Sequence, residues 1–417
     1  MKLAVKYGII ILFVPLLLML GGCPQSGGST TALARLETTE YASDHYRVQI
    51  VGFDLNNETQ ERTREAALLM EKMFAVYAGL EEMPLPPGDE MPIWLHLVRR
   101  EYDRQAALYD FPPGMTTGFC NTDGEVHVYY QRIASLGPEA TLLHEGFHQY
   151  CHRAVHLPTP PEVFQRVPNY QRRKLATVPL WLAEGMAMNM ETGRVTRDHN
   201  GFAIAIDDIG AVNRDRLRQL VEIIKSNRAP SARDIMNKIM GDQITADDYA
   251  VMWGLVFDFR MATGNAIFVR EQKELERAGP GTIDAAIQAA TDPFRSYPYM
   301  RWPVPVTGRF LRACRVAWGI DVPQVVEASV AGANSPRDFD RQWNRAITQA
   351  AFNEVERLLK DQGQTLEQWE QAWRLRMLTL QTEVRGGKYV YIEPSNIQST
   401  VRRMSPGRAN QKTGVWN

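Results

Sequence analysis

The sequence has almost no net charge and little cysteine, and both absences exclude classes of protein. Among 417 residues, 47 Lys and Arg stand against 48 Asp and Glu, which leaves a net charge of −1. A dedicated nucleic-acid-binding protein would carry a strong basic excess, so we expect no nucleic-acid partner. Four cysteines are too few for a disulfide scaffold in a chain of this size.

The composition is otherwise typical of a globular protein. Hydrophobic residues make up 44% of the chain and charged residues 23%, values that exclude a disordered polymer, a collagen and a multi-span membrane protein. We find no internal repeat. At about 150 residues per domain, the length favours two or three domains.

The first 23 residues have the pattern of a secretory signal. Lys2 and Lys6 precede an apolar run from residue 8 to 20, which is too short for a typical membrane-spanning helix. The run ends in Leu-Gly-Gly-Cys at Cys23, which resembles the bacterial lipobox. The resemblance implies lipidation of Cys23 and a protein anchored to a membrane of the bacterial cell envelope, facing the periplasm or the surface. The alternative is an ordinary cleaved signal followed by an unrelated cysteine.

Three cysteines remain after such a cleavage, namely Cys120, Cys151 and Cys314. An odd number leaves at least one without a disulfide partner. Cys120 and Cys151 are one possible pair because they flank the motif described below, but sequence alone does not fix the connectivity.

Periodicity along the chain predicts a mixed N-terminal part and a helical C-terminal part. Alternation predicts strands near residues 46–50, 93–98 and 125–130. Helical spacing predicts helices at 66–77, 138–155, 179–190, 214–225, 246–261, 339–359 and 366–380. Residues 157–168 contain four prolines and are predicted to form a loop. The basic residues from 385 onward predict a solvated tail, and the alternative is a segment that contacts an anionic surface.

The segment Leu142–Tyr150 contains the motif H-E-x-x-H, formed by His144, Glu145 and His148. On a helix, side chains four residues apart lie on one face, so both imidazoles can bind one metal ion. Neutral imidazole suits zinc. Glu145 projects about 100° away around the helix, a position from which it can act as general base on a water molecule beside the metal.

A catalytic zinc usually has three protein ligands, so a third is needed. His152 continues the four-residue spacing, but it lies eight residues from His144. Eight residues of helix rise about 12 Å and turn about 80°. Side chains that project from points so far apart cannot all reach one ion, so the third ligand must come from another segment.

Downstream, the sequence Trp-Leu-Ala-Glu-Gly at 181–185, together with H-E-x-x-H, resembles the gluzincin or peptidase-MA-like zinc metallopeptidases. The resemblance implies that Glu184 is the third ligand beside His144 and His148. The spacing from His148 to Glu184 is longer than in several members, and the proline-rich residues 157–173 account for the extra length.

Further residues are candidates for a role in the site. By the same resemblance, Tyr249 is the first candidate to stabilise an oxyanion. His199, in a predicted turn at 198–201, is the second. The aspartate that braces a ligand histidine in some members is replaced by Met188, and Glu191 is a candidate substitute. Residues 124–130 correspond either to the sheet edge that binds substrate as an extra strand or to an interior strand.

We therefore expect an α+β fold with a zincin-like catalytic domain, in which a mixed sheet adjoins the active-site helix. The expected order is a signal peptide at 1–23, a flexible tether at 24–44, the catalytic domain at 45–262, a helical region at 263–384 and a basic tail at 385–417. The expected function is a lipid-anchored zinc metallopeptidase that hydrolyses polypeptides. The alternative is a non-catalytic envelope binding protein on the same fold, with a structural or vestigial metal site.

Overall fold

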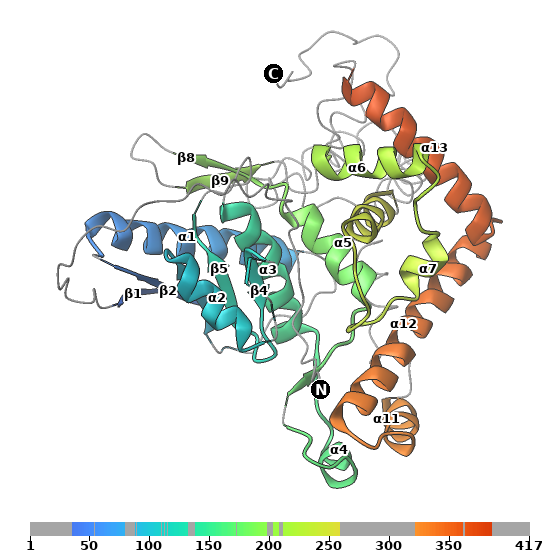
Figure 1. The fold of residues 1–417 in the computed structure, drawn as a ribbon, viewed down its shortest axis with the longest axis horizontal. Helices are drawn as coiled ribbons and strands as arrows, with labels where there is room; N and C mark the ends of the chain where they lie inside the picture. Colours follow the sequence, from blue (N-terminus) through green and yellow to red (C-terminus); the bar gives the residue numbers. More distant parts are fainter. Residues whose placement is uncertain are drawn as a thin grey trace, which may run out of the picture. The chain divides into compact units, whose positions relative to one another are not determined.

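The computed structural model describes most of the chain between residues 36 and 385, and its element order is shown in Figure 1. The described residues are 36–53, 55–79, 88, 90–109, 111, 113–114, 116–131, 138–171, 173–197, 203–207, 212–258, 322–361 and 363–385. They divide into two compact units, one of residues 36–71 and 88–149 and the other of residues 72–79 and 150–385. The expected domain boundary at 262/263 and the signal peptide lie outside the described residues.

The first unit contains a mixed five-stranded sheet. Its strand order is β1 (Glu37–Ala42), β2 (Tyr46–Gly52), β3 (Met91–His96), β5 (Val126–Tyr129) and β4 (Gly118–Cys120). The β2–β3 and β3–β5 pairs are parallel, whereas the outer pairs β1–β2 and β5–β4 are antiparallel. The chain is therefore α+β with a mixed sheet, as expected.

Alternation of side chains explains the position of β2 in this sheet. Tyr46, Val48 and Ile50 are fully buried, whereas Arg47 between them is exposed, which is the period of a strand with one face on the core. Helix α1 (Asn57–Gly79) connects β2 to β3, and α2 (Arg99–Ala107) follows β3. Apolar residues of α1 at helical spacing are buried, which confirms the predicted amphipathic helix.

The position of β5 decides whether residues 124–130 form an edge strand or an interior strand. β5 lies between β3 and β4, so residues 126–129 form an interior strand. In the described part of the chain, β4 is one edge of the sheet and β1 is the other. The interpretation of residues 124–130 as the edge is therefore wrong. β4 has only three residues, too few to show a period of two in the sequence.

A pair of buried histidines lies within this sheet. His96 Nε2 and His127 Nδ1 are 3.1 Å apart, and both rings are almost fully buried. His127 stacks on Phe119 with ring centroids 4.8 Å apart, and Tyr102 meets His96 edge-on. Burial, with the neighbouring His127, lowers the pKa of His96 to about 3.

The second unit is mainly helical. Its elements are β6 (Leu157–Pro158), α4 (Pro161–Arg166), β7 (Lys174–Leu175), α5 (Leu180–Met190), β8 (Arg194–Arg197), β9 (Ala203–Asp207), α6 (Arg214–Lys225), α7 (Ala232–Met236), α11 (Val322–Ala331), α12 (Pro336–Asp361) and α13 (Leu366–Arg385), and residues 246–258 are also helical. The helices predicted at 179–190, 214–225, 339–359 and 366–380 are confirmed. No helix among the described residues is long and apolar enough to cross a membrane.

The predicted loop at 157–168 is wrong in part, because it contains the short helix α4. Pro160 takes the N-cap position of α4 and Pro161 follows at its first turn. Proline is tolerated there because the amide it lacks would have no partner within the helix. The prolines of this segment therefore start a helix instead of excluding one.

Candidate metal centre

Helix α3 (Pro138–Ala154) carries the H-E-x-x-H motif. Its apolar residues Leu142, Leu143 and Phe147 are fully buried, so the helix is fixed by packing on these side chains. His144 and His148, one turn apart, are 2% and 3% exposed. The helix thus presents both imidazoles in the interior of the protein, away from bulk water.

A buried glutamine next to the motif anchors this helix to the sheet. Gln149 Nε2 donates hydrogen bonds to the carbonyl oxygens of Pro92 (2.7 Å) and Gly124 (2.8 Å). One carbonyl belongs to β3 and the other to the turn before β5, so the residue after His148 is tied to two places in the first unit. The sequence gives no local signal for this role, because the partners are 57 and 25 residues away.

Helix α5 carries Glu184, whose side chain is fully buried. The next residue, Gly185, lies against the helical residues 246–258. A Cβ atom at Gly185 would stand 2.7 Å from the carbonyl oxygen of Met252 and 2.3 Å from Val256 Cγ2. The glycine of Trp-Leu-Ala-Glu-Gly is therefore required by the close approach of a neighbouring backbone.

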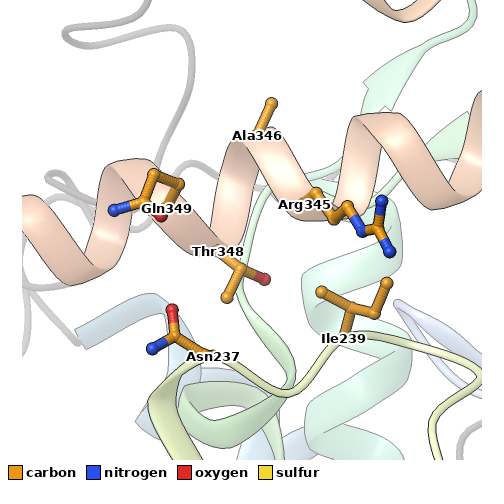
Figure 2. Close-up of a pocket in the computed structure, with 6 residues that line it drawn as sticks. All are labelled: Asn237, Ile239, Arg345, Ala346, Thr348 and Gln349. Carbon is orange, nitrogen blue, oxygen red and sulfur yellow. The ribbon is translucent and has the colours of Figure 1, made fainter. Parts of the chain in front are cut away.

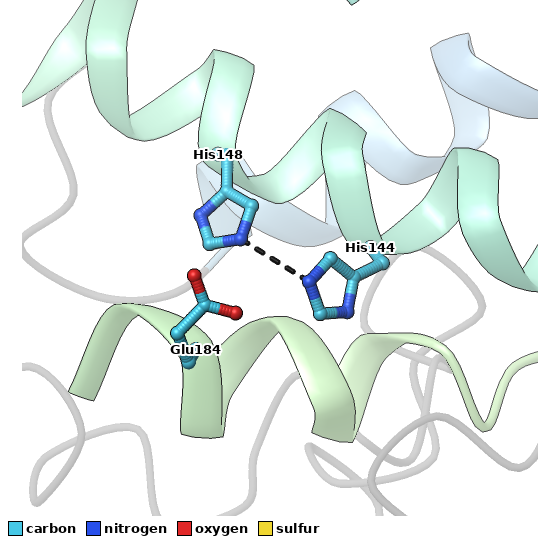
Figure 3. Close-up of side chains that lie close together, drawn as sticks. All are labelled: His144, His148 and Glu184. Atoms are coloured by element: carbon cyan, nitrogen blue, oxygen red, sulfur yellow. Dashed lines mark hydrogen bonds between the residues drawn. The ribbon is translucent and has the colours of Figure 1, made fainter. Parts of the chain in front are cut away.

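The structure brings His144, His148 and Glu184 together. One donor atom from each residue lies within 4.8 Å of the others, and all three residues are buried. His144 Nε2 and His148 Nε2 are 3.2 Å apart. Figure 3 shows the Glu184 carboxylate on α5 pointing toward the two imidazoles on α3. This buried group could hold a metal ion.

The donor separation fits a tetrahedral ion bound by imidazole nitrogen. With metal–nitrogen bonds of about 2.0–2.1 Å, two nitrogens at the tetrahedral angle are about 3.3–3.4 Å apart, close to the 3.2 Å seen between the two Nε2 atoms. The donor set of two imidazoles and one carboxylate is also one that zinc accepts. The residues present therefore fit the group that the motif implies.

Glu145 lies beside the edge strand β4. A Cβ atom built at Gly118 would stand 2.9 Å from Glu145 Cγ and 2.4 Å from Thr141 Cγ2. The backbone of β4 thus passes very close to α3 at the position of the predicted base. Gly118 is not among the residues predicted from the sequence, although a glycine within a strand is a known sign of close backbone approach.

The remaining predicted residues have other positions. His152 is half-buried, its ring centroid is 5.6 Å from that of His156, and it is not part of the metal-binding group. Tyr249 is buried, with the Arg216 guanidinium carbon 5.8 Å from its ring centroid. Its role with an oxyanion stays a prediction.

Met188, at the position of the bracing aspartate, and Glu191, the candidate substitute, lie in different surroundings. Met188 is fully buried. Glu191 accepts a hydrogen bond of 2.7 Å from Asn213 Nδ2, and its carboxylate oxygen is 3.8 Å from Arg216 Nε. These contacts tie Glu191 to α6 and its N-cap. His199 and Cys23 lie outside the described residues.

Cys120 and Cys151 do not form a disulfide with each other, and both are buried. Burial raises the pKa of the Cys151 thiol well above its usual range. A thiol that stays protonated is a poor nucleophile, so Cys151 acts as a packing residue. Cys314 lies outside the described residues.

A separate hollow of about 350 Å³ lies along α12 (Figure 2). It is lined by Asn237, Ile239, Arg345, Ala346, Thr348 and Gln349. These residues include no histidine, cysteine or carboxylate, so they offer neither the usual metal ligands nor a general base. Among the described residues, the group that offers metal ligands is therefore the one on α3 and α5.

Comparison of the chain with protein-family models, with curated proteins and with solved structures finds no match.

Proposed function

We propose that this protein is a zinc metallopeptidase of the gluzincin type with a zincin-like catalytic domain. The observation that carries the proposal is the buried group of His144, His148 and Glu184, with donor atoms within 4.8 Å of one another. Two of these residues come from H-E-x-x-H and the third from a helix 36 residues further along the chain. If these polar residues had only a packing role, there would be no reason for three potential metal ligands to converge in the interior.

The proposed ligands are the Nε2 atoms of His144 and His148 and the carboxylate of Glu184. Two neutral imidazoles and one carboxylate leave a zinc site with a net charge of about +1. Zinc held there would supply a Lewis acid that polarises a substrate carbonyl and makes a water molecule more acidic.

Glu145 is the proposed general base. It is 3% exposed and follows His144 directly, so it projects from the same turn of α3 but at a different angle. Its carboxylate accepts a proton from the attacking water as the carbon–oxygen bond forms, and returns that proton to the leaving amine as the carbon–nitrogen bond breaks. A metal site with only a structural role does not need such a base.

The edge strand β4 supports a polypeptide as the substrate. An extended peptide can add to the edge of a sheet through main-chain hydrogen bonds, and β4 is the edge that passes beside Glu145. A peptide bound along β4 would therefore have its backbone next to the proposed base.

The test is hydrolysis of a peptide library together with zinc analysis of the purified protein. Glu145→Gln keeps the shape of the side chain and should lower turnover at least about 100-fold while zinc content stays near one per chain. Glu139→Gln, on the first turn of the same helix, is the matched control and should keep full turnover. Unchanged turnover in the Glu145 variant would refute the assigned base.

Zinc content also distinguishes the two candidates for the third ligand. Glu184→Ala should lose most of its zinc on dialysis, because only two donors remain, whereas His152→Ala should keep it. The reverse pattern would overturn the ligand assignment. Zinc bound by the wild-type protein with no hydrolysis of any peptide would favour the alternative of a non-catalytic binding protein.

A further inference from the structure

The segment between α3 and α5 is a closed loop whose two ends are joined. β6 pairs with β7 so that Leu157 lies opposite Leu175. The Thr159 amide donates a hydrogen bond of 3.1 Å to the carbonyl oxygen of Arg173, and Lys174 Nζ donates one of 2.7 Å to the carbonyl oxygen of Arg153. The long segment between the two motifs is therefore held together at its two ends, immediately after α3 and shortly before α5.

Two further hydrogen bonds hold the residues that lead from β7 into α5. Thr177 Oγ1 donates to the carbonyl oxygen of Val155 at the end of α3, at 3.0 Å. Trp343 Nε1, on α12, donates to the carbonyl oxygen of Ala176 at 2.6 Å. Thr177 and Trp343 are each 1% exposed, so water does not compete for these bonds.

Helices α11 and α12 also hold the rest of the loop. Asp340 on α12 forms an ion pair with Arg173 and accepts a hydrogen bond of 2.9 Å from the Tyr170 hydroxyl. A continuous apolar cluster joins the loop to both helices, and its buried members are Val163, Val167, Tyr170, Leu175, Val326, Val330, Phe339, Trp343 and Ile347. Figure 1 shows α4 beside α11.

The first turn of α5 has no side-chain cap, whereas all residues of the helix are buried. Pro179 takes the N-cap position and provides no side-chain hydrogen bond to the first turn. Glu184 lies only five residues after Pro179. Packing of Gly185 against residues 246–258 holds the body of α5, and the chain at residues 173–177 holds the approach to its first turn. Both contacts therefore contribute to the position of the Glu184 carboxylate.

We propose that Trp343 and Asp340 of α12 are positioning residues for Glu184. By holding Arg173 and Ala176, α12 helps to fix the point at which α5 begins and so contributes to the place of the third zinc donor. This inference rests on the proposed function for its zinc readout. The C-terminal helices thus belong to the metal site in function, although they supply no ligand to the group seen in the described chain.

The first test is Trp343→Phe in the full chain, which keeps an aromatic ring in the cluster and removes the N–H donor to Ala176. Amide hydrogen exchange of residues 177–190 should become about fivefold faster, as expected for the loss of one buried hydrogen bond. The zinc dissociation constant, measured by competition with a chromophoric chelator, should rise about tenfold, as is typical when a residue that orients a ligand is lost.

The matched control is Ile347→Val, which trims the same apolar cluster and leaves the hydrogen bond to Ala176 intact. It should lower thermal stability but change the zinc dissociation constant less than twofold and leave exchange at 177–190 unchanged. Asp340→Asn is the second positioning variant, used also where Trp343→Phe does not fold, and should resemble Trp343→Phe in both readouts.

Unchanged exchange at 177–190 in folded Trp343→Phe or Asp340→Asn would overturn the proposal, as would equal losses of zinc affinity in these variants and in Ile347→Val. The exchange measurement uses metal-free protein. If the wild-type chain bound no zinc, the proposed function would fail, while exchange would still decide whether α12 positions α5.

Discussion

The buried pair His96 and His127 makes the first unit sensitive to acid. Their facing nitrogens are 3.1 Å apart, so one ring donates and the other accepts, and protonation of both would put two N–H groups in opposition. Burial and the neighbouring ring lower the pKa of His96 to about 3, against a smaller opposing effect of Glu101. In the unfolded chain the pKa of histidine is about 6.5.

The sign of the effect follows from this difference. Below pH 6.5 the unfolded state binds a proton at residue 96 that the folded state does not, so the free energy of unfolding decreases as the pH falls. At 1.36 kcal/mol per pKa unit, the loss at pH 5 is about 2 kcal/mol relative to pH 7, and it continues to grow until the pH approaches 3.

The assay is urea unfolding of metal-free protein at pH 7 and pH 5, followed by hydrogen exchange of peptides that cover β3 and β5. Removing the metal keeps titration of its ligands out of the comparison. His96→Gln cannot titrate, but its amide can still form a hydrogen bond with His127. The wild-type protein should lose about 2 kcal/mol more than the variant between the two pH values. Equal losses would show that His96 is not the acid-sensitive group.

Three further predictions concern single positions. Gly118→Ala places a methyl group against Thr141 and the proposed base. Overpacking of this kind costs about 1–3 kcal/mol and displaces the neighbouring side chains, so turnover should fall at least about tenfold. Thr141→Ala in the same chain should restore part of the turnover, and unchanged peptide hydrolysis in Gly118→Ala would contradict the close approach. Gly185→Ala should destabilise the protein by about 1–2 kcal/mol in thermal unfolding, because overpacking against Val256 exceeds the gain of about 1 kcal/mol in helix propensity; a more stable variant would refute this. Cys23→Ala should move the protein out of the membrane fraction, and a variant that still partitions into detergent as a processed lipoprotein would exclude lipidation at that residue.

Helices with clear apolar periodicity and a recognisable first residue were predictable from the sequence. α6 begins at Arg214 and ends at Lys225 as its periodicity indicates, and its N-cap Asn213 accepts a hydrogen bond from the Arg216 amide. α3 likewise begins at Pro138. In both helices the apolar spacing and the residues at the start are local properties, so tertiary structure is not needed to recognise them.

Features that depend on contacts distant in sequence were not predictable in the same way. β4 is recognisable as a strand only through its pairing with β5, and Gln149 shows its role only when Pro92 and Gly124 lie beside it. The pair His144 and His148 followed from helical spacing alone. Glu184 required the resemblance to gluzincins, because no periodicity connects residues 36 positions apart.

Because β6 pairs with β7, the distance between Leu157 and Leu175 does not depend on the number of residues between them. Paired strands place opposite Cα atoms about 5 Å apart, so Leu157 and Leu175 are close whatever number of residues lies between them. Insertions or deletions in the loop outside the residues that pack on α11 and α12 therefore need not move the end of α3 away from Leu175. The number of residues between the two motifs is for this reason a poor criterion for deciding which chains share this kind of site.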